Sequence, residues 1–198
     1  MNERKTRSGP TSATEFMVQL EQDEGYQRRK ATRRAEVEVM ARELGLAEEP
    51  IVAALKRAGV QVDSVWDLVN TSAPYPLALP VLMQHLEQGG YPERVMESLG
   101  RALAVKPAVV YWDRIKELYL APRDPGEEDG AAVALAACAT SAQFDDLIGF
   151  FSLSERGESR IYFIRPVLAL GGQKGREFVH TLLSDQVFGK EARALLTA

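Results

Sequence analysis

The sequence predicts an all-α protein whose C-terminal part is an α-solenoid, a row of stacked helix pairs, and two observations carry this prediction. The first is a set of apolar anchors, Leu82, Ile115, Leu147 and Val179, which recur at a nearly constant interval. Each anchor lies on an amphipathic segment that is followed by a turn and a second amphipathic segment. A period of roughly 20–50 residues marks stacked-repeat architectures, in which neighbouring units share one elongated core.

The second observation is that the partner segments keep the same step. Leu103, Leu135 and Leu168 recur at the same interval as the anchors, and an alanine stands beside each of them, as Ala169 does beside Leu168. Alanine lets two helix backbones approach closely where the helices cross. The sequence therefore favours about four like helix pairs, preceded by a long charged N-terminal helix.

Changes in composition divide the chain into three parts. Residues 1–12 are polar, contain Ser8-Gly9-Pro10 and are predicted to be a disordered tail. Residues 13–74 are predicted to form a helical N-terminal extension and adaptor, and residues 75–198 the repeat domain.

The extension is expected to contain three helices. Thr14 can cap a long charged helix that starts at the next residue, and Gly45 is expected to end it. Pro50 then opens a second helix, where proline is tolerated in the first turn, and Gly59 stops it. A short helix around Trp66, capped by one of the two residues at 63 and 64, completes the adaptor.

The long helix has a narrow apolar stripe, formed by Val37, Met40 and Leu44, and a basic cluster within residues 28–34. One interpretation is a solvated helix with charge pairs along its length, and the other is a basic contact surface. Because the stripe is too narrow to stabilise an isolated helix, we expect the helix to dock on the repeat domain or to self-associate.

The repeat domain is predicted to contain four pairs separated by turns rich in glycine and proline. Pro166 stands in the second helix of the third pair and is expected to bend it. The short last pair, whose register drifts, is typical of a capping repeat. The predicted pairs are 77–86 with 93–104, 107–119 with 127–139, 144–153 with 159–170, and 178–183 with 188–196.

Charge and composition exclude several classes of protein. The chain has 198 residues, a net charge of −4 and a pI of about 5.4, so it has no global attraction for nucleic acid or for anionic membranes, and we expect neither as a partner. No apolar run reaches the roughly 18–20 residues of a membrane span, and the first residues lack a secretory signal. The one cysteine, Cys138, cannot form an internal disulfide, which favours the cytoplasm.

The helix pairs also carry a resemblance. Their length, the alanine-rich second helices and the turn Arg123-Asp124-Pro125 followed by acidic and small residues resemble HEAT-type repeats over about residues 76–196, with a period that armadillo repeats and other α-solenoids share. Residues 63–70, followed by Tyr75-Pro76, are similar to a group of small bacterial HEAT-repeat proteins. This resemblance implies a scaffold or binding role and no assigned activity.

Residues that could carry catalysis are sparse. His85 and His180 lie three repeat units apart, so they should not meet, and one cysteine cannot make a zinc site. No glycine-rich segment has the phosphate-binding pattern, and no nucleophile with its base can be assembled. We therefore expect a non-enzymatic protein without a cofactor or a metal.

Two Trp-Asp dipeptides leave an alternative open. Trp112 and Asp113 resemble the tryptophan and aspartate that HEAT-like alkylpurine DNA glycosylases use on a concave surface, where the carboxylate can stabilise a cationic sugar. The structural interpretation is a tryptophan wedged between repeats beside an exposed aspartate. Acidic residues outnumber basic ones in the chain after residue 44, and this argues for the structural interpretation.

We therefore expect a binding module for a protein partner: a scaffold, a regulatory adaptor or an immunity-type binder of a basic protein such as a nuclease toxin. The acids at 127–129 could offset a helix dipole or could form an acidic face that speeds association with such a partner. The second helices should line a concave face, and the aromatic loop near Trp66 offers another contact. The residues expected to touch the partner are Trp66, Asp67, Tyr75, Glu127, Glu128, Asp129 and Arg160.

Overall fold

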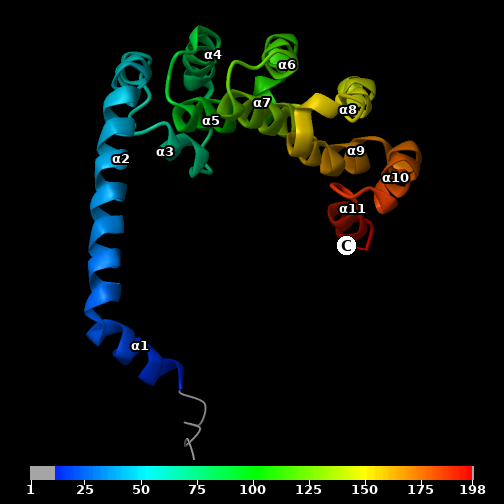
Figure 1. Cartoon of the computed structure of the whole chain (residues 1–198). Helices are drawn as coiled ribbons and strands as arrows, with labels where there is room; N and C mark the ends of the chain where they lie inside the picture. Colours follow the sequence, from blue (N-terminus) through cyan, green and yellow to red (C-terminus); the bar gives the residue numbers. More distant parts are fainter. Residues whose placement is uncertain (1–11, 198) are drawn as a thin grey trace, which may run out of the picture. The chain divides into compact units, whose positions relative to one another are not determined.

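The computed structural model describes residues 12–197, and these residues form helices and turns without a β-strand (Figure 1). The all-α class is therefore confirmed for the described part of the chain. The predicted disordered tail, residues 1–12, lies outside the described residues except for Ser12. The chain divides into two compact units at the junction between Glu43 and Leu44.

The first unit contains α1 and the first part of α2, where one long helix was predicted. Helix α1 spans Ala13–Gln22, so it begins before the expected cap Thr14, and α2 starts at Glu24. Asp23 separates them because its Oδ1 accepts a hydrogen bond from the backbone N–H of Tyr26 at 2.8 Å and so caps α2. The predicted single helix is thus interrupted at the Asp23 cap.

Helix α2, Glu24–Arg57, does not stop where the sequence predicted. Gly45 has no positive φ and lies inside the helix, and Pro50 is likewise an interior residue. Pro50 removes one backbone hydrogen bond, but Ile51 and Leu55 are fully buried, and this burial holds the helix beyond the proline. The predicted boundary at residues 45–50 was wrong because tertiary packing outweighs local propensity here.

The second unit begins with the end of α2 and continues as short helices in chain order. The α-helices are α3 (Trp66–Val69), α4 (Leu79–Gln88), α5 (Glu93–Ala102), α6 (Trp112–Leu120), α7 (Pro125–Cys138), α8 (Phe144–Phe150), α9 (Ile164–Leu170), α10 (Gly172–Thr181) and α11 (Gly189–Leu196). The 3-10 helices are η1 (Pro76–Ala78), η2 (Lys106–Tyr111), η3 (Ser141–Gln143), η4 (Ser154–Phe163) and η5 (Leu182–Ser184). The four predicted pairs correspond to α4 with α5, α6 with α7, α8 with α9, and α10 with α11.

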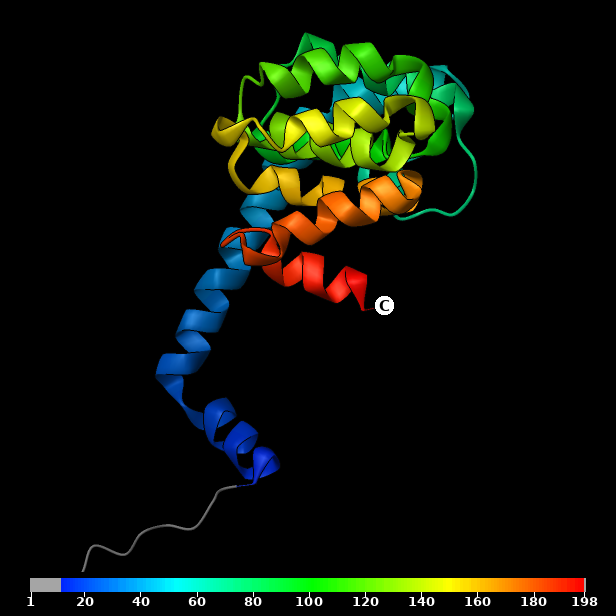
Figure 2. The same cartoon turned by 90° about the vertical axis from the view of Figure 1, so that its right-hand side faces the viewer.

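The helices of the first three pairs are arranged in two rows. Figure 1 shows α4, α6 and α8 on one side of α5, α7 and α9. Helix α7 is central, because it packs on α5, α6, η4 and α9. The last pair follows α9, on which both α10 and α11 pack (Figure 2).

The core of this unit contains the predicted anchors. Leu82, Ile115, Leu147 and Val179 have no exposed surface. Leu103 and Leu135 of the second helices are also fully buried, while Leu168 is half-buried. The expectation that these positions face the interior is confirmed.

The closest approach between second helices depends on glycine as well as alanine. A Cβ on Gly100 of α5 would lie 2.3 Å from the carbonyl carbon of Gly130 on α7, and a Cβ on Gly126 would lie 2.0 Å from the Glu93 carbonyl oxygen. Because these backbones touch, α5 and α7 share the most extensive contact of the unit. Ala169 differs from the alanines at 102 and 134, because it is exposed rather than buried.

Two arginines of the second unit each connect one turn to the helix pair that precedes it. Arg123 donates hydrogen bonds to the carbonyl oxygens of Leu86 at 2.7 Å and Glu87 at 2.8 Å, at the end of α4. Arg156 stands one repeat period later and donates to the carbonyl oxygen of Leu120 at 3.0 Å, at the end of α6. Cations there satisfy carbonyls that lack partners in the helix and complement the helix dipole.

The third pair differs most from its prediction. The segment predicted as one helix over 159–170 is the 3-10 helix η4 followed by α9. Pro166 is therefore in the first turn of α9, where its missing N–H leaves no hydrogen bond unmade, and it does not bend a longer helix. Helix α10 likewise begins at Gly172, well before the predicted start at residue 178.

Candidate functional site

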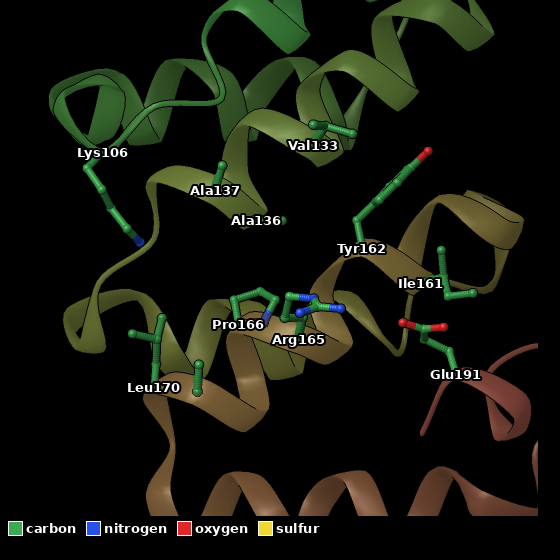
Figure 3. Close-up of a pocket in the computed structure, with 11 residues that line it drawn as sticks. Lys106, Val133, Ala136, Ala137, Ile161, Tyr162, Arg165, Pro166, Leu170 and Glu191 are labelled. Carbon is green, nitrogen blue, oxygen red and sulfur yellow. The ribbon is translucent and has the colours of Figure 1, made fainter. Parts of the chain in front are cut away.

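An open groove lies on the side of the second helices, between α7, the η4–α9 segment and α11 (Figure 3). Its volume is about 600 Å³, which is within the range of roughly 300–1,000 Å³ that small ligands or inserted side chains occupy. Apolar side chains provide most of its surface. They belong to Val133, Ala136, Ala137, Ile161, Pro166, Ala169 and Leu170.

Three charged residues border this groove. Lys106 donates a hydrogen bond from Nζ to the Ala139 carbonyl oxygen at 2.9 Å. The side chains of Arg165, which is exposed, and Glu191, which is half-buried, make no hydrogen bond or ion pair with any described residue. Figure 3 shows Lys106 and Glu191 at opposite sides of the groove. The groove thus combines an apolar floor with uncommitted charges at its edge.

Tyr162 forms part of the groove wall and links it to α5. Its hydroxyl lies 3.5 Å from Nη2 of Arg101, and Nε of Arg101 donates to Glu97 at 2.6 Å. This chain of polar contacts holds the half-buried tyrosine in place while its ring faces the groove. An apolar ligand would therefore meet a preformed surface.

The three acids predicted to form one acidic face have different environments. Glu127 is fully buried, where its carboxylate accepts from the backbone N–H of Arg123 at 2.7 Å and from the Arg123 guanidinium. A carboxylate without exposed surface cannot contact a partner, so Glu127 does not belong to an interface. It anchors the arginine that holds the end of α4.

Glu128 and Asp129 are half-buried. Glu128 accepts a hydrogen bond from Ser159 Oγ at 2.6 Å and pairs with Arg156 at 3.3 Å. Burial, and then the nearby Glu97, raise the pKa of the Asp129 carboxyl above its ordinary value. Of the three acids, Asp129 alone lacks a direct ion pair with another described residue.

The predicted aromatic contacts are engaged in local structure. The Asp67 carboxylate accepts from the backbone N–H groups of Asp63 at 2.8 Å and Ser64 at 3.0 Å, just before α3. Trp66 is half-buried, and the Tyr75 hydroxyl donates to the Ala102 carbonyl oxygen at 3.0 Å. Tyr75 also lines a second cavity of about 330 Å³ beside the loop over residues 71–76.

Arg160, also predicted at the interface, closes the third pair. Its Nη1 donates to the Phe151 carbonyl oxygen at 2.8 Å, and its guanidinium lies 5.0 Å from the centre of the Phe188 ring. The structure therefore distributes the seven predicted residues over several places rather than gathering them in one site.

Trp112 and Asp113 do not form a paired site. Trp112 is 6% exposed, and its indole Nε1 donates to Asp146 at 2.9 Å, while Asp113 is exposed. Burial alone would raise the pKa of Asp146, but hydrogen bonds from Lys116 and Trp112 hold this pKa below its ordinary value. The tryptophan is thus fixed in the core, where it is not free to stack on a base.

The other candidate reactive groups are separated. Burial raises the pKa of the Cys138 thiol to about 11, so the thiol is a core group. His85 Nδ1 lies 2.7 Å from the Tyr91 hydroxyl, and His180 is exposed. Among residues 12–197, no cluster of three or more acids, histidines or cysteines could hold a metal. Within the same residues, no helix combines the length and the apolar composition that a membrane span needs.

Sequence reasoning expected a concave face along the second helices but named none of the residues that line this groove, because its floor consists of ordinary small apolar residues. The one available signal was that Ala169 follows Leu168, whereas Ala102 and Ala134 precede their leucines. Comparisons of the chain with protein-family models, with curated protein sequences and with solved structures found no match.

Proposed function

We propose that the second unit is an α-solenoid of four HEAT-like helix pairs and that it is a non-enzymatic docking module for another protein. Support for the architecture comes from the evenly spaced buried anchors and from the arrangement of the first three pairs in two rows. The arginine contacts at 123 and 156, one period apart, support it as well. Solenoids expose an extended face for macromolecular partners.

The groove is the observation that carries the proposed function. Its apolar floor can receive side chains of a partner, and the charges of Lys106, Arg165 and Glu191 can orient that partner. Since Arg165 and Glu191 have no partners of their own in the described chain, binding would break no ion pair at either residue. Docking there would therefore desolvate apolar surface without breaking an existing ion pair, and opposite charges on the partner would offset the lost hydration of Arg165 and Glu191.

A single substitution tests this proposal. Ala169→Trp puts a large ring into the groove from an exposed helix position, so it should block docking without unfolding the protein. Ala53→Trp is the matched control, because Ala53 is also an exposed helical alanine and does not line the groove. Both variants should keep the circular dichroism spectrum of the original protein.

The binding measurement uses the tagged full chain in an extract of its native host, followed by titration of the purified partner. A partner that binds the original protein and Ala53→Trp, but binds Ala169→Trp at least about tenfold more weakly, supports docking in the groove. Equal affinity of all three proteins would place the interface elsewhere.

A nucleic-acid function is the rival class, and duplex DNA titrated at physiological salt tests it directly. Trp112, the residue on which that alternative depends, is buried and hydrogen-bonded to Asp146. DNA binding that Asp113→Asn abolishes would overturn the docking proposal in favour of this alternative.

A further inference from the structure

The first unit carries a surface that the docking proposal does not use. Every residue from Arg28 to Glu43 in α2 is exposed. These residues include Val37, Val39 and Met40, which are 59%, 57% and 51% exposed. A helix gains most of its stability by packing an apolar face against another element, so this segment requires a partner surface.

The charges of this segment are strongly separated. Residues 28–34 carry five cations and no acid, whereas residues 36–43 carry three acids and one cation. Two ion pairs form along the helix, Arg28 with Glu24 at 2.8 Å and Arg34 with Glu38 at 3.0 Å. The remaining cations of the basic half, at 29, 30 and 33, make no ion pair with any described residue.

This charge separation makes the segment complementary to itself in one orientation. Two copies running in parallel would place the five cations of one helix beside those of the other. Two copies running antiparallel place each basic half beside an acidic half, and the same contacts occur on both sides of a two-fold axis. Arg33, Val37 and Met40, spaced four and three residues apart, form a narrow seam on one face of this helix. Arg29, Glu36 and Glu43 lie beside this seam, so the charges and the exposed apolar side chains belong to the same face.

We propose that residues 24–43 of α2 pair with the same residues of a second copy of this chain, antiparallel, around a two-fold axis near Ala35. The segment spans about 30 Å, so the contact is small and its strength depends on the charges. The dimer should therefore dissociate more readily at high salt. This inference does not depend on the groove.

Charge-reversal variants test whether the partner of this segment is a second copy of the chain. Sedimentation equilibrium of the full chain should show a monomer–dimer equilibrium, and the dissociation constant should rise about tenfold or more in the variant Arg29→Glu/Lys30→Glu/Arg33→Glu. The same should hold for Glu36→Lys/Glu43→Lys. Mixing the two variants should restore the dimer, because one segment is then largely acidic and the other largely basic.

The control reverses three cations elsewhere. Lys174→Glu/Arg176→Glu/Lys190→Glu changes the net charge by the same amount at exposed positions of α10 and α11. This variant should dimerise as the original protein does. A monomer at every concentration, or equal weakening by the control, would overturn the proposal.

Introduced cysteines test the orientation. Lys30→Cys and Met40→Cys add accessible thiols at exposed positions beside the seam, whereas the native Cys138 is fully buried. In the antiparallel dimer a disulfide should join position 30 of one chain to position 40 of the other. Position 30 should not join itself, because the two copies lie about 15 Å apart along the helix there. Efficient cross-linking of position 30 to itself would show a parallel pair and contradict the proposal.

Discussion

Individual side chains in this protein show that charge can have a structural role where a surface role was expected. Glu127 is acidic and begins a run of three acids, yet it is fully buried against Arg123. A buried carboxylate without its partner is costly, so the pair is retained as a unit. Its function is to hold the guanidinium that binds the end of α4.

Replacement of the buried carboxylate should therefore destabilise the second unit. Glu127→Gln keeps the size of the side chain but weakens its hydrogen bonds with Arg123, and it should lower the free energy of unfolding by about 1–3 kcal/mol. Urea denaturation measures this change. Glu155→Gln, at an exposed position, is the control and should have almost no effect; equal stability of the two variants would contradict the structural role of Glu127.

The raised pKa of Asp129 predicts that replacing this acid stabilises the protein, whereas replacing Glu127 destabilises it. Burial and Glu97 favour the protonated form in the folded protein, so the ionised carboxylate reduces stability above its folded pKa, and the loss is relieved as the pH falls through this value. Asp129→Asn should raise the melting temperature at neutral pH. The difference from the original protein should shrink on acidification, and a difference independent of pH would refute the electrostatic explanation.

At the scale of the helices, the backbone contact between α5 and α7 decides where side chains can be tolerated. Gly100 lies against Gly130 so closely that any Cβ would overlap backbone atoms. Gly45, in α2, has no neighbour within 4 Å of an added Cβ. The same residue type thus has different roles in two helices.

Substitution of glycine by alanine should change the free energy of unfolding in opposite directions at positions 100 and 45. Gly100→Ala should lower the free energy of unfolding by about 1–3 kcal/mol, because α5 and α7 must move apart. Gly45→Ala should raise it by about 0.5–1 kcal/mol, because alanine loses less backbone entropy in a helix. Thermal or urea unfolding of both variants measures the pair, and destabilisation of equal size at both positions would contradict this explanation.

At the scale of the whole molecule, the core belongs to the second unit. Every described residue that is buried lies at position 48 or later. Residues 44–198 therefore contain the complete set of apolar side chains from which the core is built.

Removal of residues 1–43 should leave this core intact and abolish self-association. We expect the shortened chain to unfold cooperatively at nearly the original temperature in dilute solution and to sediment as a monomer. Thermal denaturation and sedimentation measure the two outcomes separately. A dimer that persists after the deletion would show that the self-associating surface lies outside the first unit.

The helical class and the positions of the buried anchors follow from local pattern alone. Leu82, Ile115, Leu147 and Val179 could be identified because burial on one face of each helix imposes a period that can be counted. The turn between α4 and α5 was also predictable, since Gly89 and Gly90 adopt positive φ angles that other residues avoid.

Other features depend on contacts between residues that are distant in the chain, so they became visible only in three dimensions. The continuation of α2 beyond Pro50, the burial of Glu127 and the exposure of Ala169 at the groove each follow from neighbours that no local pattern specifies. Proline inside a helix costs about 3 kcal/mol and other residues at most about 1 kcal/mol, whereas burying one large apolar side chain contributes about 1.5–3 kcal/mol. Burial of Ile51 and Leu55 together therefore offsets the cost of Pro50. Packing therefore sets the boundaries of the helices and the surface that they leave open.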